Sequence, residues 1–301
     1  MHYLTELDLD ASETVALLDV ASKLKAERSA GVLRQDLAGR HVALYFEKPS
    51  VRTRVSFTVG VRELGGDVVE LGGQNTKVGV GEDPADFAMV MGGYVHLLVA
   101  RVFAQKTVAT FAASAGIPVI NALSDERHPC QALADALTIR ERLGRIEGVR
   151  FVFVGEGNNV AVSTGLLLAT LGAEVIIAAP NNYGLPAAIR ADIDRLQLKV
   201  SSTESVAAAV KGAQVLYTDT WVSMGQEAEK AQREAIFAGY RIGLDTLAQA
   251  APEAIVMHCL PAVRGQEIDA AVMYHPASAL WQQAENRLHV QKALMLRLLG
   301  R

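Results

Sequence analysis

Short apolar segments of strand length alternate with helical patterns along this chain, and the alternation occurs twice. The apolar segments lie at 41–46, 67–71, 96–102 and 118–121 in the first half, and at 149–155, 173–180, 213–219 and 254–261 in the second. Strands that alternate with helices form parallel sheets covered by helices on both faces. Because 301 residues are too many for one typical core, we predict an α/β fold with two doubly wound parallel-sheet domains joined by interdomain helices.

The helical patterns suggest where the two domains meet. A helix near 130–143 forms the predicted bridge, and a second long helical pattern covers 278–299. We therefore place one domain at 1–130, completed by the C-terminal helix at about 285–301, and the other at 131–284. Near the N-terminus, Asp10 or Ser12 is predicted to cap the first helix.

The composition argues against several classes of protein. Half of the residues are hydrophobic and 21% are charged, as in a well-buried globular protein. A net charge of -4 gives no reason to expect a nucleic acid or a membrane surface as partner. Only two cysteines are present, and the apolar segments are far shorter than the roughly 20 residues of a membrane helix. The start has no pattern of a secretory signal, so we expect a cytoplasmic protein.

Ligands of such folds bind at the carboxyl ends of strands, so the polar segments that follow strands are the candidate sites. The first is Glu47–Arg54, which opens a helix and supplies two hydroxyls, two arginines and free backbone N–H groups. This combination suits a phosphate. The alternative is a capped helix with a solvated basic turn, but two arginines in a first turn oppose the helix dipole, so we favour an anion site.

Two further candidates are weaker when each is taken alone. Arg101 ends an apolar strand, where an arginine is usually a structural residue. His128 and Gln131 stand one turn apart at the start of the bridging helix, so both can reach one carbonyl or amide. A satisfied core histidine is the commoner situation for a residue such as His128.

The segment Gly155–Asn159 also follows a strand, and its Gly-x-Gly pattern raises the possibility of dinucleotide binding. That pattern is incomplete, because Val160 replaces the third glycine and no acidic residue ends the next strand. Its two asparagines instead favour a polar or zwitterionic ligand, although an asparagine turn also explains Asn158.

The last candidates are Asp219–Gly225 and His258–Pro261, which both follow strands. An aspartate at a strand end can hold an ammonium group. Cys259 could be a nucleophile activated by a histidine, but His258 points to the opposite side if the strand continues. A buried inert cysteine is the common case, so these residues alone leave the role of Cys259 open.

Together these segments resemble the aspartate/ornithine carbamoyltransferase family, and specifically its ornithine branch. The family's phosphate motif corresponds to Ser50–Arg54, its His-Pro-x-Gln motif to His128–Gln131, and its His-Cys-Leu-Pro motif to His258–Pro261. The ornithine-branch signature Asp-x-x-x-Ser-Met-Gly corresponds to Asp219–Gly225, and 284–289 also matches. The motifs come in the family's order and cover nearly the whole chain.

The resemblance implies roles for individual residues, with Cys259 as an orienting group and not a covalent nucleophile. Catalytic roles would belong to Arg101, His128 and Cys259. Carbamoyl phosphate would be bound by Ser50, Val51, Arg52, Thr53, Lys77, Arg101, His128, Gln131, Cys259, Leu260 and Arg287. L-Ornithine would be bound by Asn159, Asp219, Ser223 and Met224.

The resemblance also implies the reaction and the assembly. The chain would transfer the carbamoyl group of carbamoyl phosphate to the side-chain amine of L-ornithine, in arginine biosynthesis, without a metal or cofactor. The domain at 1–130 would bind carbamoyl phosphate and the domain at 131–284 would bind ornithine. The expected partner is the chain itself, in a homotrimer with active sites at subunit interfaces; neither nucleic acid nor membrane is expected.

Three positions depart from the family's pattern: Val51, Lys77 and Val162. Separately from these departures, there are two main alternatives to ornithine transfer. One is another acceptor, such as putrescine, N-acetylornithine or aspartate, and the other is a non-catalytic trimeric scaffold. The Ser223–Gly225 signature favours ornithine, and the catalytic residues argue against a scaffold. A nicotinamide dehydrogenase is the most distant alternative.

Overall fold

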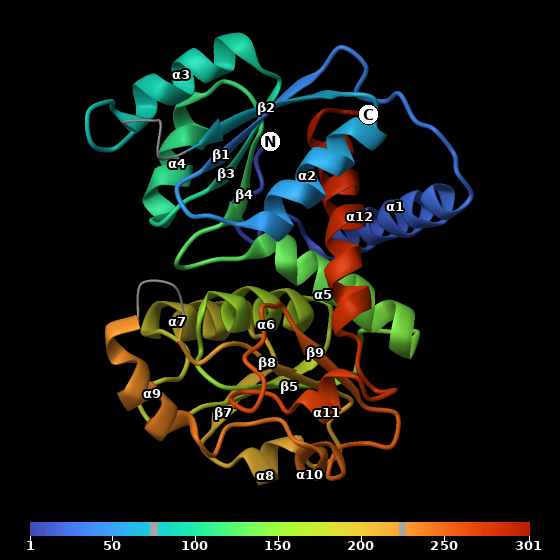
Figure 1. Cartoon of the computed structure of the whole chain (residues 1–301), viewed down its shortest axis with the longest axis vertical. Coiled ribbons are helices and arrows are strands. Elements are labelled where there is room, and N and C mark those ends of the chain that lie inside the picture. Colours follow the sequence, from blue (N-terminus) through green and yellow to red (C-terminus); the bar gives the residue numbers. More distant parts are fainter. Residues whose placement is uncertain (73–77, 223–226) are drawn as a thin grey trace. The chain divides into compact units, whose positions relative to one another are not determined.

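The computed structural model of the protein describes residues 1–72, 78–222 and 227–301. Lys77, Ser223 and Met224, three of the predicted binding residues, lie outside the described residues. The chain forms two compact units (Figure 1). The first unit comprises Met1–Leu137 and Asn286–Arg301, and the second comprises Thr138–Glu285. The fold predicted from the sequence, two parallel-sheet domains with alternating helices, is confirmed.

The first unit is built on a four-stranded parallel sheet in the order β2-β1-β3-β4. Its strands are β1 (His41–Phe46), β2 (Asp67–Gly72), β3 (Leu97–Arg101) and β4 (Val119–Leu123). Because the first strand lies inside the sheet, the chain winds outward in both directions from it. The strand order therefore reverses between β1 and β3, and a ligand site of a doubly wound sheet is expected there.

Helices cover both faces of this sheet (Figure 1). The helices of this unit are α1 (Ala11–Ser29), α2 (Val51–Glu63), α3 (Pro84–Tyr94), α4 (Gln105–Ser114), the start of α5 (Pro129–Leu143) and most of α12 (Leu280–Leu298). On one face the rings of Tyr45, Phe87 and Phe111 pack with centroids 5.2–5.5 Å apart. Elsewhere α2 approaches α12 closely at Gly60, where an added Cβ would lie 3.2 Å from Cγ of Lys292.

The second unit is built on a five-stranded parallel sheet in the order β7-β6-β5-β8-β9. The strands are β5 (Arg150–Val154), β6 (Glu174–Ala178), β7 (Val200–Thr203), β8 (Val215–Thr218) and β9 (Ile255–His258). The strand order reverses between β5 and β8, so the expected ligand site follows these two strands.

Helices also cover this second sheet. They are α6 (Asn159–Thr170), α7 (Ala187–Leu196), α8 (Val206–Val210), α9 (Lys230–Phe237), α10 (Leu244–Leu247) and α11 (Ala270–Met273), with a short 3-10 turn at Glu227–Glu229. An aromatic pair lies within the sheet, where the rings of Phe153 and Tyr217 stack with centroids 5.4 Å apart. Within the part of the chain that the structure describes, no helix is long and apolar enough to span a bilayer.

The predicted elements agree with the structure except at one strand. All eight apolar segments contain strands, and Asp10 caps α1 in a capping box with Glu13. Strand β7 was not predicted; it has four residues, of which the two serines are exposed and the two end residues are partly buried. It lies at the edge of the sheet, where one side of the strand needs no apolar partner, so it leaves no apolar run in the sequence.

Candidate active site

In the first unit, five buried side chains meet beyond the carboxyl ends of β1 and β3. Arg287 donates from Nη2 to Oγ1 of Thr53 at 2.8 Å and from Nη1 to Oε1 of Gln131 at 3.0 Å. The same Nη1 lies 3.5 Å from Nε2 of His128. Arg101 donates from Nη1 to the Thr53 hydroxyl at 3.5 Å. We call these five residues the arginine cluster.

The arginine cluster holds two buried guanidinium groups around one hydroxyl. Like charges repel more strongly in a buried setting than in water, so an anion with several oxygens is the natural ligand of this group. Burial lowers the pKa of His128 well below its usual value, and the nearby charges of Arg287 and Arg101 lower that pKa further. The imidazole is therefore neutral at pH 7, and it can donate one hydrogen bond without carrying charge.

The start of α2 supplies the other predicted phosphate contacts. Ser50 is the N-cap residue of α2, and its side chain makes no capping hydrogen bond. Val51 and Arg52 are exposed in the first turn, so the structure does not bring them into the buried cluster. Arg54 pairs with Glu70 on β2, and its guanidinium lies 4.7 Å from the ring of Phe46.

Lys48 is a buried cation of this unit to which the sequence analysis gave no role. It is 5% exposed, pairs with Asp125, and lies 4.4 Å from the ring of Phe103. The pair joins the segment after β1 to the segment after β4, and the latter leads directly to His128. The signal was present, since Lys48 belongs to the predicted anion segment, but the sequence did not reveal its partner.

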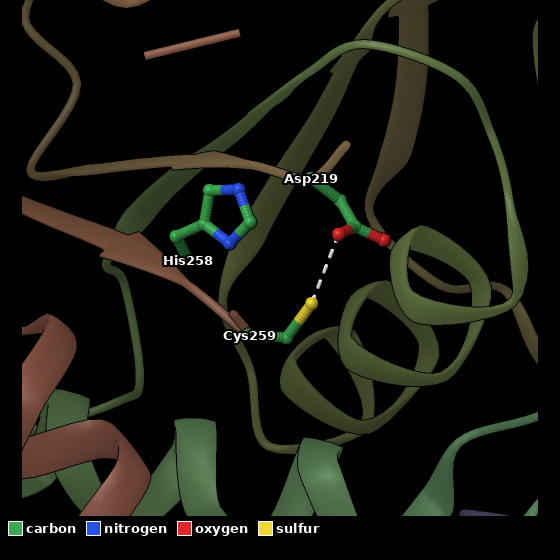
Figure 2. A group of neighbouring side chains, drawn as sticks. All are labelled: Asp219, His258 and Cys259. Carbon is green, nitrogen blue, oxygen red and sulfur yellow. Dashed lines mark hydrogen bonds between the residues drawn. The ribbon is translucent and has the colours of Figure 1, made fainter. Parts of the chain in front are cut away.

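In the second unit, Asp219 follows β8 and accepts three hydrogen bonds from described residues. Its Oδ2 accepts from Nδ2 of Asn158 at 2.9 Å. Its Oδ1 accepts from the backbone N–H of Thr220 at 2.8 Å and from Sγ of Cys259 at 3.0 Å (Figure 2). Asn158 also caps α6 through its side-chain oxygen. The carboxyl ends of β5, β8 and β9 thus converge on one carboxylate.

His258 and Glu267 form a buried pair behind Cys259. Nδ1 of His258 accepts from the backbone N–H of Leu260 at 2.8 Å, and its Nε2 lies 3.2 Å from Oε1 of Glu267. Because Nδ1 accepts a hydrogen bond, Nε2 carries the ring proton and donates a hydrogen bond to the carboxylate of Glu267. Both ring nitrogens are therefore engaged, and His258 is not available as a base for Cys259. We call Asn158, Asp219, His258, Cys259 and Glu267 the aspartate cluster.

This geometry bears on the question that the sequence left open about Cys259. Strand β9 ends at His258, so strand alternation no longer governs the direction of the Cys259 side chain. The thiol donates to Asp219, while both ring nitrogens of His258 have other partners, which agrees with the prediction of an orienting group. Ligand atoms of Asp219, His258 and Cys259 lie within 4.8 Å of one another, but the imidazole would have to give up one of its hydrogen bonds to hold a metal.

Other predicted residues of this unit have clear positions. Asn159 is the first residue of α6 and is partly buried. Leu260 has a backbone φ of 60° and precedes a cis bond to Pro261. Val162, one of the departures from the family's pattern, is buried within α6 at 2% exposure. Glu267 was missed by the sequence analysis, because a single glutamate nine residues beyond His258 gives no local signal.

Comparisons with known proteins agree with this geometry. Residues 1–141 match the family model "Aspartate/ornithine carbamoyltransferase, carbamoyl-P binding domain", and residues 147–298 match the model of the "Asp/Orn binding domain" of the same family. The chain is 49% identical to the ornithine carbamoyltransferase of Acidothermus cellulolyticus, over 99% of this chain and 96% of that protein.

Solved structures give the same result. The ornithine carbamoyltransferase of Pyrococcus furiosus superposes with a TM-score of 0.95 at 42% identity, over 99% of this chain and 97% of that one. The enzyme of Thermus thermophilus gives a TM-score of 0.89 at 38% identity, over 98% of each chain. With two family models in sequence order and near full-length relatives, the chain belongs to the aspartate/ornithine carbamoyltransferase family.

Proposed function

We propose that this enzyme transfers the carbamoyl group of carbamoyl phosphate to the side-chain amine of L-ornithine, giving citrulline and phosphate. The observation that carries this proposal is the 49% identity, over 99% of the chain, to a protein named ornithine carbamoyltransferase. The charges of the two clusters agree with it, since one suits a phosphate and the other suits an ammonium group.

Carbamoyl phosphate is assigned to the first unit. Ser50, Arg52, Thr53 and the backbone N–H of Val51 hold the phosphate, while Arg101 bridges phosphate and carbonyl oxygen. His128 donates to the carbonyl oxygen, and Arg287 completes the site. This assignment is supported by the match of residues 1–141 to a carbamoyl phosphate-binding domain and by the buried guanidinium groups.

Gln131 is assigned to the carbamoyl amine. Its Nε2 donates to Oδ1 of Asp135 at 2.8 Å, which orients the amide, and its Oε1 already accepts from Arg287. A carbonyl oxygen has two acceptor positions. The second position on Oε1 therefore remains for the N–H of the carbamoyl group.

L-Ornithine is assigned to the second unit. Asp219 pairs with the α-ammonium, and Asn159, Ser223 and Met224 bind the remaining backbone groups of the substrate. A carboxylate offers about four acceptor positions, and the three donors among the described residues leave room on Asp219 for one more hydrogen bond. The Cys259 sulfur and the Leu260 carbonyl align the side-chain amine.

The chemistry follows from these assignments. The neutral amine attacks the carbamoyl carbon, and negative charge grows on the carbonyl oxygen while the bond to phosphate breaks. Donors that face this oxygen, Arg101 and His128, stabilise the growing charge. Holding both substrates in the reactive geometry supplies much of the remaining acceleration.

An assay with carbamoyl phosphate and a panel of amines tests the reaction. We expect citrulline from L-ornithine, and little product from putrescine, N-acetylornithine or L-aspartate. Equal turnover of another amine would reassign the acceptor. No carbamoylation of any amine would favour the non-catalytic scaffold.

We also propose a cytoplasmic homotrimer that serves arginine biosynthesis, in which Lys77 of one subunit completes the phosphate site of the next. Light scattering measures the assembly. Mixing an Arg101→Ala variant with a Lys77→Ala variant, each inactive alone, is expected to restore partial activity, because some sites of the hybrid receive both native residues. Hybrids that form without any activity contradict the shared site.

A further inference from the structure

One buried arginine outside both clusters joins the two loops that carry the acceptor groups. Arg233 lies on α9 and is 2% exposed. Its Nε donates to the backbone oxygen of Trp221 at 2.6 Å, and its Nη2 pairs with Glu156. Its Nη1 lies 3.5 Å from Oε2 of Glu229. This buried guanidinium therefore connects three segments of the chain, at Trp221, Glu156 and Glu229.

Two of these segments belong to the loops at the reversal of strand order. Glu156 follows β5, and its backbone oxygen accepts from the N–H of Asn158 at 2.7 Å. Trp221 follows β8 and stands two residues after Asp219. The side chains of Asn158 and Asp219 meet directly at 2.9 Å. Through its contacts with Glu156 and Trp221, Arg233 connects the same two loops at a second place.

Aromatic rings hold the guanidinium in place. Its Cζ lies 5.3 Å from the ring centroid of Tyr183 and 5.4 Å from that of Phe237. The backbone oxygen of Tyr183 accepts from the N–H of Gly157 at 2.7 Å. Stacking of a planar cation on aromatic rings restricts its rotation, so the ring of Tyr183 and its backbone both support the loop after β5.

We propose that Arg233 is a positioning residue for the acceptor, which fixes the separation between the Asn158 loop and the Asp219 loop and thereby sets the affinity for ornithine. The proposal rests on the proposed function, since it concerns ornithine binding by the same cluster. Arg233 does not contact substrate; it acts through the Trp221 carbonyl and the Glu156 carboxylate.

An arginine is required for this role because of its shape. One planar group donates to a carbonyl and to a carboxylate in different directions, with fixed geometry. A lysine has one flexible ammonium group, so it can keep the ion pair with Glu156 but lacks the fixed fork that also reaches Trp221. Arg233→Lys therefore keeps the charge and removes the connection.

The test compares the Michaelis constants of the two substrates. In Arg233→Lys we expect the KM for ornithine to rise about 10-fold to 100-fold, as when one or two charge-assisted hydrogen bonds are lost, with the KM for carbamoyl phosphate within about twofold of the original. Glu156→Gln keeps the shape and still accepts from the guanidinium, so we expect a smaller rise, about 3-fold to 10-fold. Lys230→Ala changes an exposed cation of the same helix and is expected to leave both constants unchanged.

The outcomes separate positioning from general stability. A variant that merely unfolds in part loses kcat in proportion to the active fraction and leaves both KM values unchanged; that result overturns the proposal. If Arg233→Lys fails to fold, Glu156→Gln decides, and an unchanged ornithine KM there also overturns the proposal. If the unaltered enzyme forms no citrulline, the proposed function itself fails, which is a different result from ornithine turnover with unchanged KM in the variants.

Discussion

The arginine cluster and the aspartate cluster lie at the same kind of position, the reversal of strand order in a doubly wound sheet, but their electrostatics are opposite. The arginine cluster holds two guanidinium groups close together, and like charges at short range favour an anion. In the aspartate cluster, the carboxylate of Asp219 accepts three hydrogen bonds from described residues. The first cluster is therefore suited to bind an anion by charge, and the second is suited to select a ligand by the direction of its hydrogen bond to Asp219.

The largest expected effect is the preference of the enzyme for ornithine over putrescine, which tests whether Asp219 selects the acceptor. Putrescine lacks the α-ammonium and α-carboxylate of ornithine, so it would leave the groups around Asp219 unpaired. Sites built on such groups reject the incomplete analogue by about 10⁴-fold or more. We therefore expect kcat/KM for ornithine to exceed kcat/KM for putrescine by about 10⁴-fold or more. In Asp219→Asn, we expect ornithine turnover to fall sharply and the preference for ornithine over putrescine to become much smaller.

The control for this prediction lies in the other cluster. Calorimetry should give the same affinity for carbamoyl phosphate in Asp219→Asn and in the unaltered enzyme. Equal efficiency with putrescine, or full ornithine turnover in the variant, would show that Asp219 does not select the acceptor. Val162 would then be the first residue to test.

The next effect concerns the arginine cluster. Replacing Arg101 with alanine removes a donor from the carbonyl oxygen in the transition state, and we expect kcat to fall about 10²-fold to 10³-fold. Arg52→Ala changes an exposed arginine, so we expect it to weaken carbamoyl phosphate binding and to lower kcat far less than Arg101→Ala. Steady-state kinetics and calorimetry measure both. If Arg101→Ala raised only the ornithine KM, the division of labour between the clusters would be wrong.

The dependence of rate on pH is a smaller effect. The side-chain amine of ornithine resembles that of lysine, whose ordinary pKa is about 10.4, so its reactive neutral fraction rises about tenfold per pH unit below that value. His128 is already neutral at pH 7, because its pKa is lowered, and adds no opposing step above that pH. We expect kcat/KM for ornithine to rise from pH 7 towards pH 9, and a flat profile would contradict attack by the free amine.

The smallest effect is on stability in acid. The pKa of His128 is lowered in the folded state, so the unfolded chain binds a proton more readily than the folded one. Stability from this group is complete above the unfolded pKa of about 6.5, and it is lost as the pH falls below that value towards the folded pKa. The slope is at most about 1.4 kcal/mol per pH unit.

Comparing the denaturant stability of the unaltered protein with that of His128→Gln isolates this contribution. The two proteins should differ less at pH 5.5 than at pH 7.5. Carboxyl groups also titrate in acid, but they are common to both proteins and cancel in the difference. A difference that is independent of pH would mean that His128 keeps an ordinary pKa.

The sequence predicted the sheets well because buried parallel strands leave apolar runs. It failed at β7, whose serines leave no such run. It also predicted the segments after β1, β5, β8 and β9, since polar residues directly after a strand are a local signal. Arg287 entered only through the family resemblance, because one arginine in a long helix carries no local signal.

Arg233 and Glu267 escaped the sequence analysis for a related reason. Each is a charged residue whose partners lie elsewhere along the chain: Arg233 pairs with Glu156, 77 residues away, and Glu267 pairs with His258. Only the packed structure reveals that these residues are buried. A lone charge in a helix or loop is otherwise most simply explained as a solvated surface residue.

The division of the chain has a consequence for its synthesis. The second unit is inserted into the first, which is resumed only at Asn286. Arg287, and the part of α12 that packs on Gly60, therefore leave the ribosome after the whole second unit. The second unit can therefore fold before the first is complete. The arginine cluster can form only after Arg287 in α12 has been synthesised. A chain that ended before Asn286 would contain every residue of the aspartate cluster but would lack Arg287 of the arginine cluster.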